Sequence, residues 1–175
     1  MLTTARLELR PFRLEDADAL HALFTDADVR RWLLDDEVVP REWVDKEIAE
    51  SEARFAAGGC GLWALREPPA EAVIGFVGFR PFFEPPEMQL LYGLVPTAWG
   101  RGLATEAAHT AMAYGFDTVG FHEVRAATDV PNTASIAVLE RLGFEEWRRS
   151  EEGVAGTVFF RVSLGQRREG LSTLP

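Results

Sequence analysis

The chain has 175 residues and a formal net charge of −10, with 47% hydrophobic and 26% charged residues. This length and balance predict one globular domain with a substantial core, and they exclude a disordered chain. The negative charge also argues against nucleic acid as a partner, because its phosphates would be repelled.

The first half of the chain contains one strand pattern followed by helical patterns. Alternation of apolar and charged residues over 6–13 predicts a half-buried strand. Helical spacing over 15–24 predicts a helix, and the acidic segment 26–37 predicts a short helix and a loop. Pro40 can open a longer helix that ends at Gly58-Gly59.

The second half alternates apolar segments with turn residues and two further helices. Strands are expected at 62–66, 73–83, 87–95, 121–128, 144–149 and 157–164, and helices from Gly102 and from Asn132 to Gly143. The order predicts a single α/β domain over residues 1–165. Its sheet is mixed and mostly antiparallel, with about seven strands flanked by about four helices. Residues 166–175 are expected to form a polar, frayed tail.

The cysteine count and the hydropathy pattern bear on the compartment. Cys60 is the only cysteine, so no internal disulfide can form and a reducing compartment is expected. A buried, inert thiol is favoured over a nucleophile at this position. No charged leader precedes an apolar stretch, and no run reaches the roughly 18 apolar residues of a membrane helix. A cytoplasmic protein without a membrane partner is predicted. The oligomeric state is left open, a dimer included, and no metal site is predicted.

The segment 91–106 is the most informative part of the chain. An apolar strand ends at Pro96, and a turn containing Gly100 and Gly102 leads into a helix. Glycine allows a ligand to approach the backbone closely, and the first turn of a helix has amide groups without intrahelical partners. These donors and the positive end of the helix dipole form an anion site. The turn therefore predicts a phosphate-bearing cofactor at residues 100–105.

Three alternatives for this turn differ in the further residues that they require. A P-loop needs a lysine in the turn, and Lys46 is the only lysine in the chain. A dinucleotide fingerprint fits Gly100, Gly102 and the distant acidic residue Glu123. However, Thr105 replaces its third glycine, and hairpins precede the motif. A turn that only joins a strand to a helix is the third alternative.

A second motif narrows the choice. Residues 132–144, Asn-Thr-Ala-Ser-Ile-Ala-Val-Leu-Glu-Arg-Leu-Gly-Phe, resemble a signature of the Gcn5-related N-acetyltransferase (GNAT) superfamily. The match is to the subgroup around the ribosomal-protein alanine N-acetyltransferases. Residues 99–104, Trp-Gly-Arg-Gly-Leu-Ala, resemble the acetyl-CoA signature of the same superfamily. Both motifs have the expected order and separation, and the strand order matches this fold over residues 5–164.

The resemblance implies acetyl-CoA as the cofactor and names its binding residues. Backbone amides of Gly100, Arg101, Gly102, Leu103, Ala104 and Thr105 would bind the pyrophosphate. The strand Tyr92-Gly93-Leu94-Val95 would hydrogen-bond the pantetheine arm, with Leu94 and Val95 as its binding residues, and Gly93 could permit the bulge that splays this strand in the family. Asn132 and Ser135 match positions that contact the arm near its sulfur. Residues from this strand and two motifs are thus predicted to share one site.

The catalytic residues are less well defined by the resemblance. Relatives often have a tyrosine at the position of Leu139, which in this chain lies on the apolar face of the helix and is expected in the core, so Ser135 is the candidate acid. They often have a glutamate base at the position of Gln89, whose neutral amide cannot accept an ammonium proton. Glu87 lies two residues away on the same strand face, so it could act as a base through a water molecule. A solvated role for Glu87 beside the Pro85-Pro86 turn is the alternative.

The acceptor region has an acidic and aromatic composition. In the family it lies between the first two helices and the last two strands. In this chain those segments supply carboxylates and aromatic side chains that would suit a cationic acceptor with an apolar portion: Asp26, Asp28, Asp35, Asp36, Glu37, Trp32, Trp43, Phe82, Phe83 and Trp147. Solvated loop charges and core aromatics are the alternative.

The predicted activity is N-acetylation of a primary amine by direct attack in a ternary complex. A protein N-terminal α-amine is favoured, and a small amine is the other acceptor considered. The alternatives are another acyl donor such as succinyl-CoA, or a non-catalytic acyl-CoA-binding domain that has lost its base.

Overall fold

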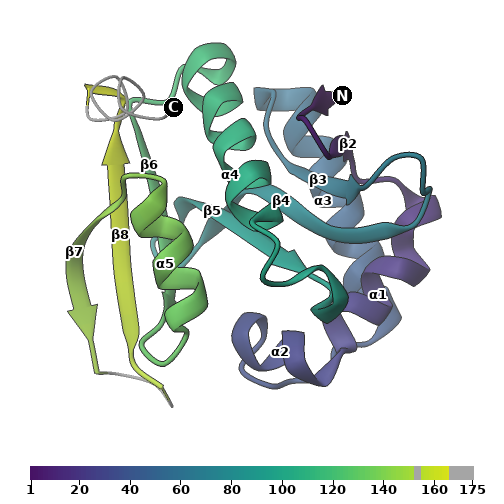
Figure 1. The fold of residues 1–175 in the computed structure, drawn as a ribbon, viewed down its shortest axis with the longest axis horizontal. Coiled ribbons are helices and arrows are strands. Elements are labelled where there is room, and N and C mark those ends of the chain that lie inside the picture. The colour runs from purple at the N-terminus through teal and green to yellow at the C-terminus, as the bar shows by residue number, and fades with distance from the viewer. Residues whose placement is uncertain (152–154, 166–175) are drawn as a thin grey trace.

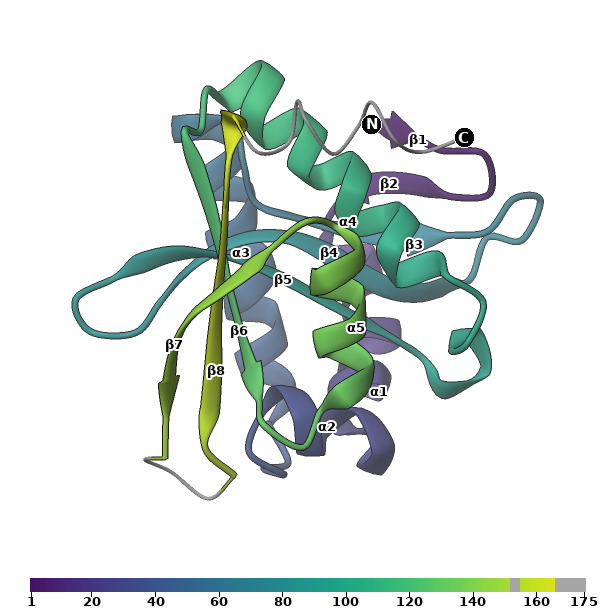
Figure 2. The ribbon, with the colours of Figure 1, turned by 60° about the vertical axis from the view of Figure 1, so that its left-hand side comes forward.

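The backbone is organised around a twisted sheet with helices on both faces (Figures 1 and 2). The computed structural model describes residues 1–151 and 155–165, and the expected tail at 166–175 lies outside them. Within the described residues the sheet has eight strands in the order β1-β2-β3-β4-β5-β6-β8-β7. Their bounds are β1 Leu2–Thr3, β2 Glu8–Pro11, β3 Leu62–Arg66, β4 Val73–Phe82, β5 Glu87–Leu94, β6 Glu123–Asp129, β7 Glu145–Ser150 and β8 Thr157–Ser163.

Five α-helices connect these strands in the described part of the chain. Their bounds are α1 Ala17–Thr25, α2 Ala27–Leu33, α3 Arg41–Gly58, α4 Leu103–Tyr114 and α5 Thr133–Arg141. Short 3₁₀ turns cover Leu14–Asp16 and Pro96–Ala98, and a π-helical turn, Gly115–Val119, follows α4. No helix among these is long and apolar enough to cross a membrane.

The predicted mixed, mostly antiparallel α/β fold is confirmed. The sheet has one strand more than the seven expected, because β1 has only two residues and leaves no alternation in the sequence. The five helices lie where the segments predicted helices, although their number was expected to be about four. The short helix expected within 26–37 is α2, and Asp26 caps it: its side chain accepts from the amides of Asp28 and Val29.

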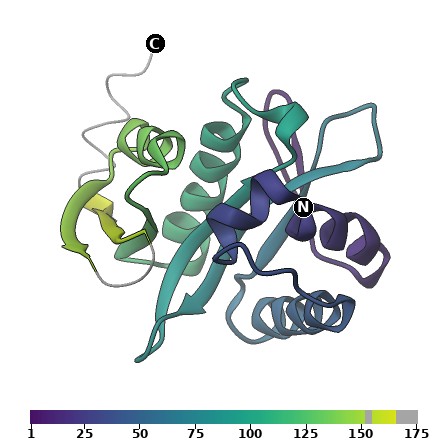
Figure 3. The ribbon, with the colours of Figure 1, turned by 90° about the horizontal axis from the view of Figure 1, so that it is seen from below.

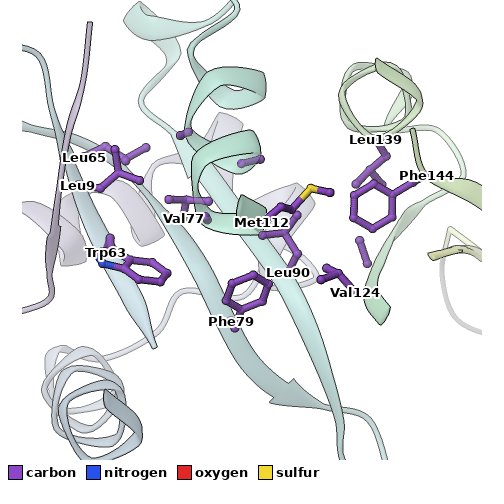
Figure 4. Close-up of a cluster of buried hydrophobic side chains, with 14 of the residues drawn as sticks. Leu9, Trp63, Leu65, Val77, Phe79, Leu90, Met112, Val124, Leu139 and Phe144 are labelled. Carbon is purple, nitrogen blue, oxygen red and sulfur yellow. The ribbon is translucent and has the colours of Figure 1, made fainter. Parts of the chain in front are cut away.

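Two hydrophobic clusters hold the helices on the sheet. Helices α1, α2 and α3 cover one face around Phe76, and α4 covers the other around Val77 (Figure 4). Strand β3 contributes Leu62 and Ala64 to the first cluster, and Trp63 and Leu65 to the second. Both faces of β3 are therefore buried, which explains why residues 62–65 are apolar without interruption.

The parallel strands β5 and β6 form a fork. They pair at one register position, Gln89 with Arg125, whereas every other neighbouring pair in the sheet is antiparallel. Beyond that position the strands diverge, as Figures 1 and 2 show. Helix α2 crosses β5 in the view from below (Figure 3) and contacts it. The fork leaves space between two strands of one sheet, and helices close it on both sides.

The bulge expected at Gly93 is absent from the pairing of β5 with β4. The register runs unbroken from Gly75 opposite Leu94 to Phe82 opposite Glu87. Gly93 is needed for packing instead, because a Cβ there would lie 2.7 Å from Phe76 Cε1 and 3.0 Å from Leu33 Cδ1. The splay therefore lies between β5 and β6 and requires no bulge against β4.

Candidate functional site

A cavity of about 580 Å³ occupies the fork. Residues of β5, β6 and α5 line it, together with the turn before α4 and with α2 and the loop after it. Apolar surface predominates, as is usual for small-molecule sites. Most of the residues that the two sequence motifs single out therefore meet in one place.

The glycine turn presents open backbone to this cavity. Gly100 and Gly102 have φ values of 70° and 76°, and a Cβ added at Gly100 would meet no atom within 4 Å. No side chain caps α4 at Gly102, and the first backbone bond of the helix runs from the Glu106 amide to the Gly102 carbonyl. The amides of 103–105 are therefore available as donors at the positive end of a 12-residue helix. This open cradle fits a pyrophosphate.

Side chains from distant segments fix the turn in position. The Arg101 guanidinium binds the Glu67 carboxylate, with Nη1 3.0 Å from Oε2, and this hydrogen bond lowers the pKa of Glu67. Arg6 donates from Nη1 to the Arg101 carbonyl at 2.8 Å and from Nε to Glu106 at 2.7 Å. The Trp99 indole donates to the Leu94 carbonyl at 2.8 Å. These bonds preorganise the turn.

Eight of the ten predicted cofactor residues line the cavity: Leu94, Gly100, Gly102, Leu103, Ala104, Thr105, Asn132 and Ser135. Val95 and Arg101 do not. The Val95 amide already donates to the Ile74 carbonyl at 2.9 Å. The Arg101 side chain is held by Glu67, so only its backbone remains for a ligand.

Asn132 and Ser135 begin α5, and a tyrosine meets them from the opposite wall. The Asn132 side chain accepts from the Ser135 amide at 3.1 Å, which confirms the predicted helix cap. Ser135 Oγ lies 2.8 Å from the hydroxyl oxygen of Tyr92 on β5. Burial raises the pKa of Tyr92 to about 12, and the bond to Ser135 opposes this only in part. Leu139 is buried in the core, as predicted.

Gln89 lies at the base of the fork and is only 3% exposed. Its Nε2 donates to Glu87 Oε2 at 3.4 Å, which confirms that the two side chains share a face. Its Oε1 is buried and has no hydrogen-bond partner among the described residues. Glu87 does not line the cavity. Its carboxylate binds the Arg125 guanidinium, with Nη1 2.7 Å from Oε1. The structure thus places the candidate base in an ion pair behind Gln89.

The residues expected around the acceptor divide into two groups. Asp35, Trp32, Phe82 and Phe83 line the cavity. The others lie outside its lining: Asp26 caps α2, Asp28 and Asp36 bind Arg31 and Arg30, Glu37 is exposed, Trp43 packs on Phe24, and Trp147 lies among arginines on β7 and β8.

Five polar side chains of the described cavity lining were not predicted from the sequence: Tyr92, Thr128, Asp129, Arg141 and Thr157. Tyr92 supplies the hydroxyl beside Ser135, Asp129 ends β6, and Arg141 lies in the last turn of α5. Burial, and then the charge of Asp35, raises the pKa of Asp129. The position of Asp129 between a strand and the cap of α5 is a signal that could have suggested a cavity residue. Tyr92 gives no such signal, because its partner lies 43 residues away.

Comparisons with known proteins agree with this geometry. The family model described as "Acetyltransferase (GNAT) domain" matches residues 6–145. The uncharacterized N-acetyltransferase YoaA of Bacillus subtilis is 26% identical over 147 residues, which is 83% of each chain. The spermidine N(1)-acetyltransferase of Escherichia coli K12 is 29% identical over 143 residues, covering 79% of this chain and 72% of that one.

A solved structure shows the same fold. RimL, a ribosomal L7/L12 alpha-N-protein acetyltransferase crystallised with coenzyme A, superposes with a TM-score of 0.80 at 16% identity, covering 94% of this chain and 98% of that one. The family model spans most of the chain, and the cavity places the motif residues together. The chain belongs to the GNAT acetyltransferase family and is an acetyl-CoA-dependent N-acetyltransferase.

Proposed function

We propose that the enzyme acetylates an α-amino group, or another amine of low pKa, by direct attack in a ternary complex. One observation carries this proposal. The buried side chain at the base of the fork is Gln89, a neutral amide, and the nearby carboxylate of Glu87 is bound by Arg125. A site built this way favours an acceptor that is already neutral.

The free-energy cost of deprotonating each amine shows how strongly such a site would favour one acceptor class over another. A lysine-like amine with a pKa of about 10.4 needs roughly 4.6 kcal/mol to lose its proton at pH 7. An α-amino group with a pKa of about 7.7–8.0 needs only about 1–1.4 kcal/mol. Without a strong base, this difference of about 3 kcal/mol in deprotonation cost passes directly into the rate for the two acceptor classes.

The lining residues suit a division of roles along the cavity. Acetyl-CoA, when bound, supplies the thioester that the amine attacks. The amides of the turn at 100–105 would hold its pyrophosphate, and the walls of β5 and α5 would enclose its arm. Ser135, with its hydroxyl beside Tyr92, would donate a hydrogen bond to the departing sulfur.

Direct attack is favoured over an acyl-enzyme route. Cys60, the only cysteine, is buried, and burial raises the pKa of its thiol. It does not line the cavity. A thiol with a raised pKa is a poor nucleophile, so it does not suit an acyl carrier.

The test compares two acceptor classes with the same enzyme. Release of coenzyme A thiol from acetyl-CoA gives kcat/KM at pH 7 for a peptide that begins with alanine and for polyamines. We expect the peptide to be the better acceptor by at least tenfold. Equal or better turnover of the polyamines would overturn the proposal.

A further inference from the structure

Two carboxylate side chains without a partner among the described residues belong to the cavity lining. They are those of Asp35, in the loop after α2, and Asp129, at the end of β6. Within the described residues neither side chain has a hydrogen bond or an ion pair, unlike Asp28 and Asp36 near them. Burial, and then the charge of Asp35, raises the pKa of Asp129, which agrees with both carboxylates lying in the lining of one cavity.

The cavity lining also contains a positively charged side chain, which comes from α5. Arg141 is the one cationic side chain among the described lining residues, and no ion pair joins it to either aspartate. It comes from the last turn of α5, whereas Asp129 precedes the first turn of the same helix. A nine-residue helix is about 13 Å long, so the cavity has negative charge at one end of α5 and positive charge at the other.

A second observation, independent of the carboxylates, points to a ligand in the same cavity. Gln89 is only 3% exposed and lines the cavity. Within the described residues its Oε1 has no hydrogen-bond partner. The side-chain amide of Gln89 cannot be flipped, because its oxygen, a hydrogen-bond acceptor, would then face the Glu87 carboxylate, which is also an acceptor. A buried acceptor without a partner costs about 1–3 kcal/mol, so a donor from a ligand is expected there.

We propose that Gln89 Oε1 accepts an N–H from the reacting amine, while Asp35 and Asp129 bind a second positive charge on the same acceptor. This inference rests on the proposed function and names its substrate class: low-pKa amines that carry another cationic group.

The geometry limits where that second charge lies. Gln89 is level with Arg125, and Asp129 is four residues further along β6, which is about 13 Å at 3.3 Å per residue. The side chains of Gln89 and Asp129, at the two ends of this distance, shorten the gap that the acceptor must span. An N-terminal α-amine with a lysine or arginine at the second or third position spans it, since each extended residue adds about 3.5 Å.

The experiment uses matched peptides and matched variants of the full chain. The peptides begin Ala-Lys or Ala-Gln and are otherwise identical, and kcat/KM is measured at saturating acetyl-CoA. We expect the wild type to prefer the lysine peptide by about tenfold, within the range found for close charge pairs. Asp35→Asn and Asp129→Asn should reduce that preference toward one by lowering turnover of the lysine peptide only.

Two further variants serve as controls. Glu37→Gln removes a charge from the loop of Asp35 without touching the cavity lining, and it should retain the wild-type preference. Gln89→Met should lower turnover of both peptides and leave their ratio unchanged, because Gln89 contacts the group that they share. Unchanged turnover of the glutamine peptide shows that an aspartate variant is folded.

The outcomes separate this inference from the proposed function. A lysine-to-glutamine ratio near one in the wild type, or an unchanged ratio in both aspartate variants, would overturn the second-charge site. If neither peptide reacts but small amines do, the α-amine proposal fails. The second-charge site is then judged by the same criterion with 1,3-diaminopropane against 3-aminopropan-1-ol.

Discussion

The hydroxyl oxygen of Tyr92 on β5 lies 2.8 Å from Ser135 Oγ on α5, so one hydrogen bond spans the fork. The Tyr92 hydroxyl also lies within donating distance, 3.2 Å, of the Ser135 carbonyl. Because burial raises the pKa of Tyr92 to about 12, the phenol remains protonated at neutral pH. Position 139 in α5, where relatives often have a tyrosine, is a buried leucine in this chain. A phenol from the opposite wall lies beside the candidate acid instead.

Tyr92→Phe should lower kcat by about tenfold, less than the roughly 10²–10⁴-fold that a direct acid–base group contributes, and leave the KM for acetyl-CoA unchanged. The reason is that Ser135 would lose the partner that orients its hydroxyl. Ser135→Ala should have an effect at least as large, and the double variant should be no worse than Ser135→Ala alone, because the two residues act as a unit. Steady-state kinetics at saturating acceptor checks all three variants.

Tyr114→Phe is the matched control for this pair. Tyr114 packs against Trp63 in the core and does not line the cavity, so its hydroxyl should be dispensable for kcat. Equal loss of kcat in the Tyr114 and Tyr92 variants, or a loss confined to the KM for acetyl-CoA, would contradict a role of Tyr92 in the chemical step.

Gly100→Ala should weaken acetyl-CoA binding by at least tenfold, because its Cβ would occupy the open face of the cradle. A left-handed φ also costs about 1 kcal/mol of stability for alanine, independently of the ligand. Gly120→Ala isolates that second effect: Gly120 has a φ of 85°, no atom near its Cβ, and lies outside the cavity lining. Calorimetric titration and thermal melts of both variants separate the two effects. Similar dissociation constants for the two variants would refute the assignment.

Gln89→Glu should create a base and change the preference for amines. The new carboxyl group would be buried beside Glu87, and both burial and the like charge raise its pKa. We therefore expect kcat/KM for polyamines at pH 7 to rise, with the rate increasing through the pKa of the new group rather than through that of the amine. The measurement is a pH–rate profile for one polyamine with both enzymes. Superimposable profiles would count against the position of Gln89 beside the reacting amine.

Asp129→Asn should stabilise the protein at pH 7 while impairing the use of dicationic acceptors. The pKa of Asp129 is raised in the folded state, first by burial and then by Asp35, so the folded protein binds this proton more tightly than the unfolded chain. The charged carboxylate therefore lowers stability at neutral pH, and this penalty disappears as the pH falls through the raised pKa toward about 3.9. Thermal melts from pH 7 to pH 4 should show a higher Tm for the variant that converges on the wild type. A lower Tm at pH 7 would contradict the prediction.

Much of this architecture could be read from the sequence, because its signals are local. Alternation, helical spacing and turn residues predicted the long strands and the helices, and the glycine turn before α4 was recognisable from residues within one segment. The Asn132 cap and the burial of Leu139 follow from helix geometry in the same way. Only β1, with two residues, was too short for any such signal.

Tertiary structure alone decided how the site is assembled. The pairing of Gln89 with Arg125, the bond between Tyr92 and Ser135, and the approach of Asp35 to Asp129 join segments far apart in the chain. Periodicity assigns a side chain to a face of its own element, but it contains no information about which other element that face meets. The sequence by itself determined the family, the cofactor turn and the absence of a glutamate at position 89. The fork between β5 and β6 decided which phenol meets Ser135 and which carboxylates face the acceptor, because packing of distant elements sets those distances.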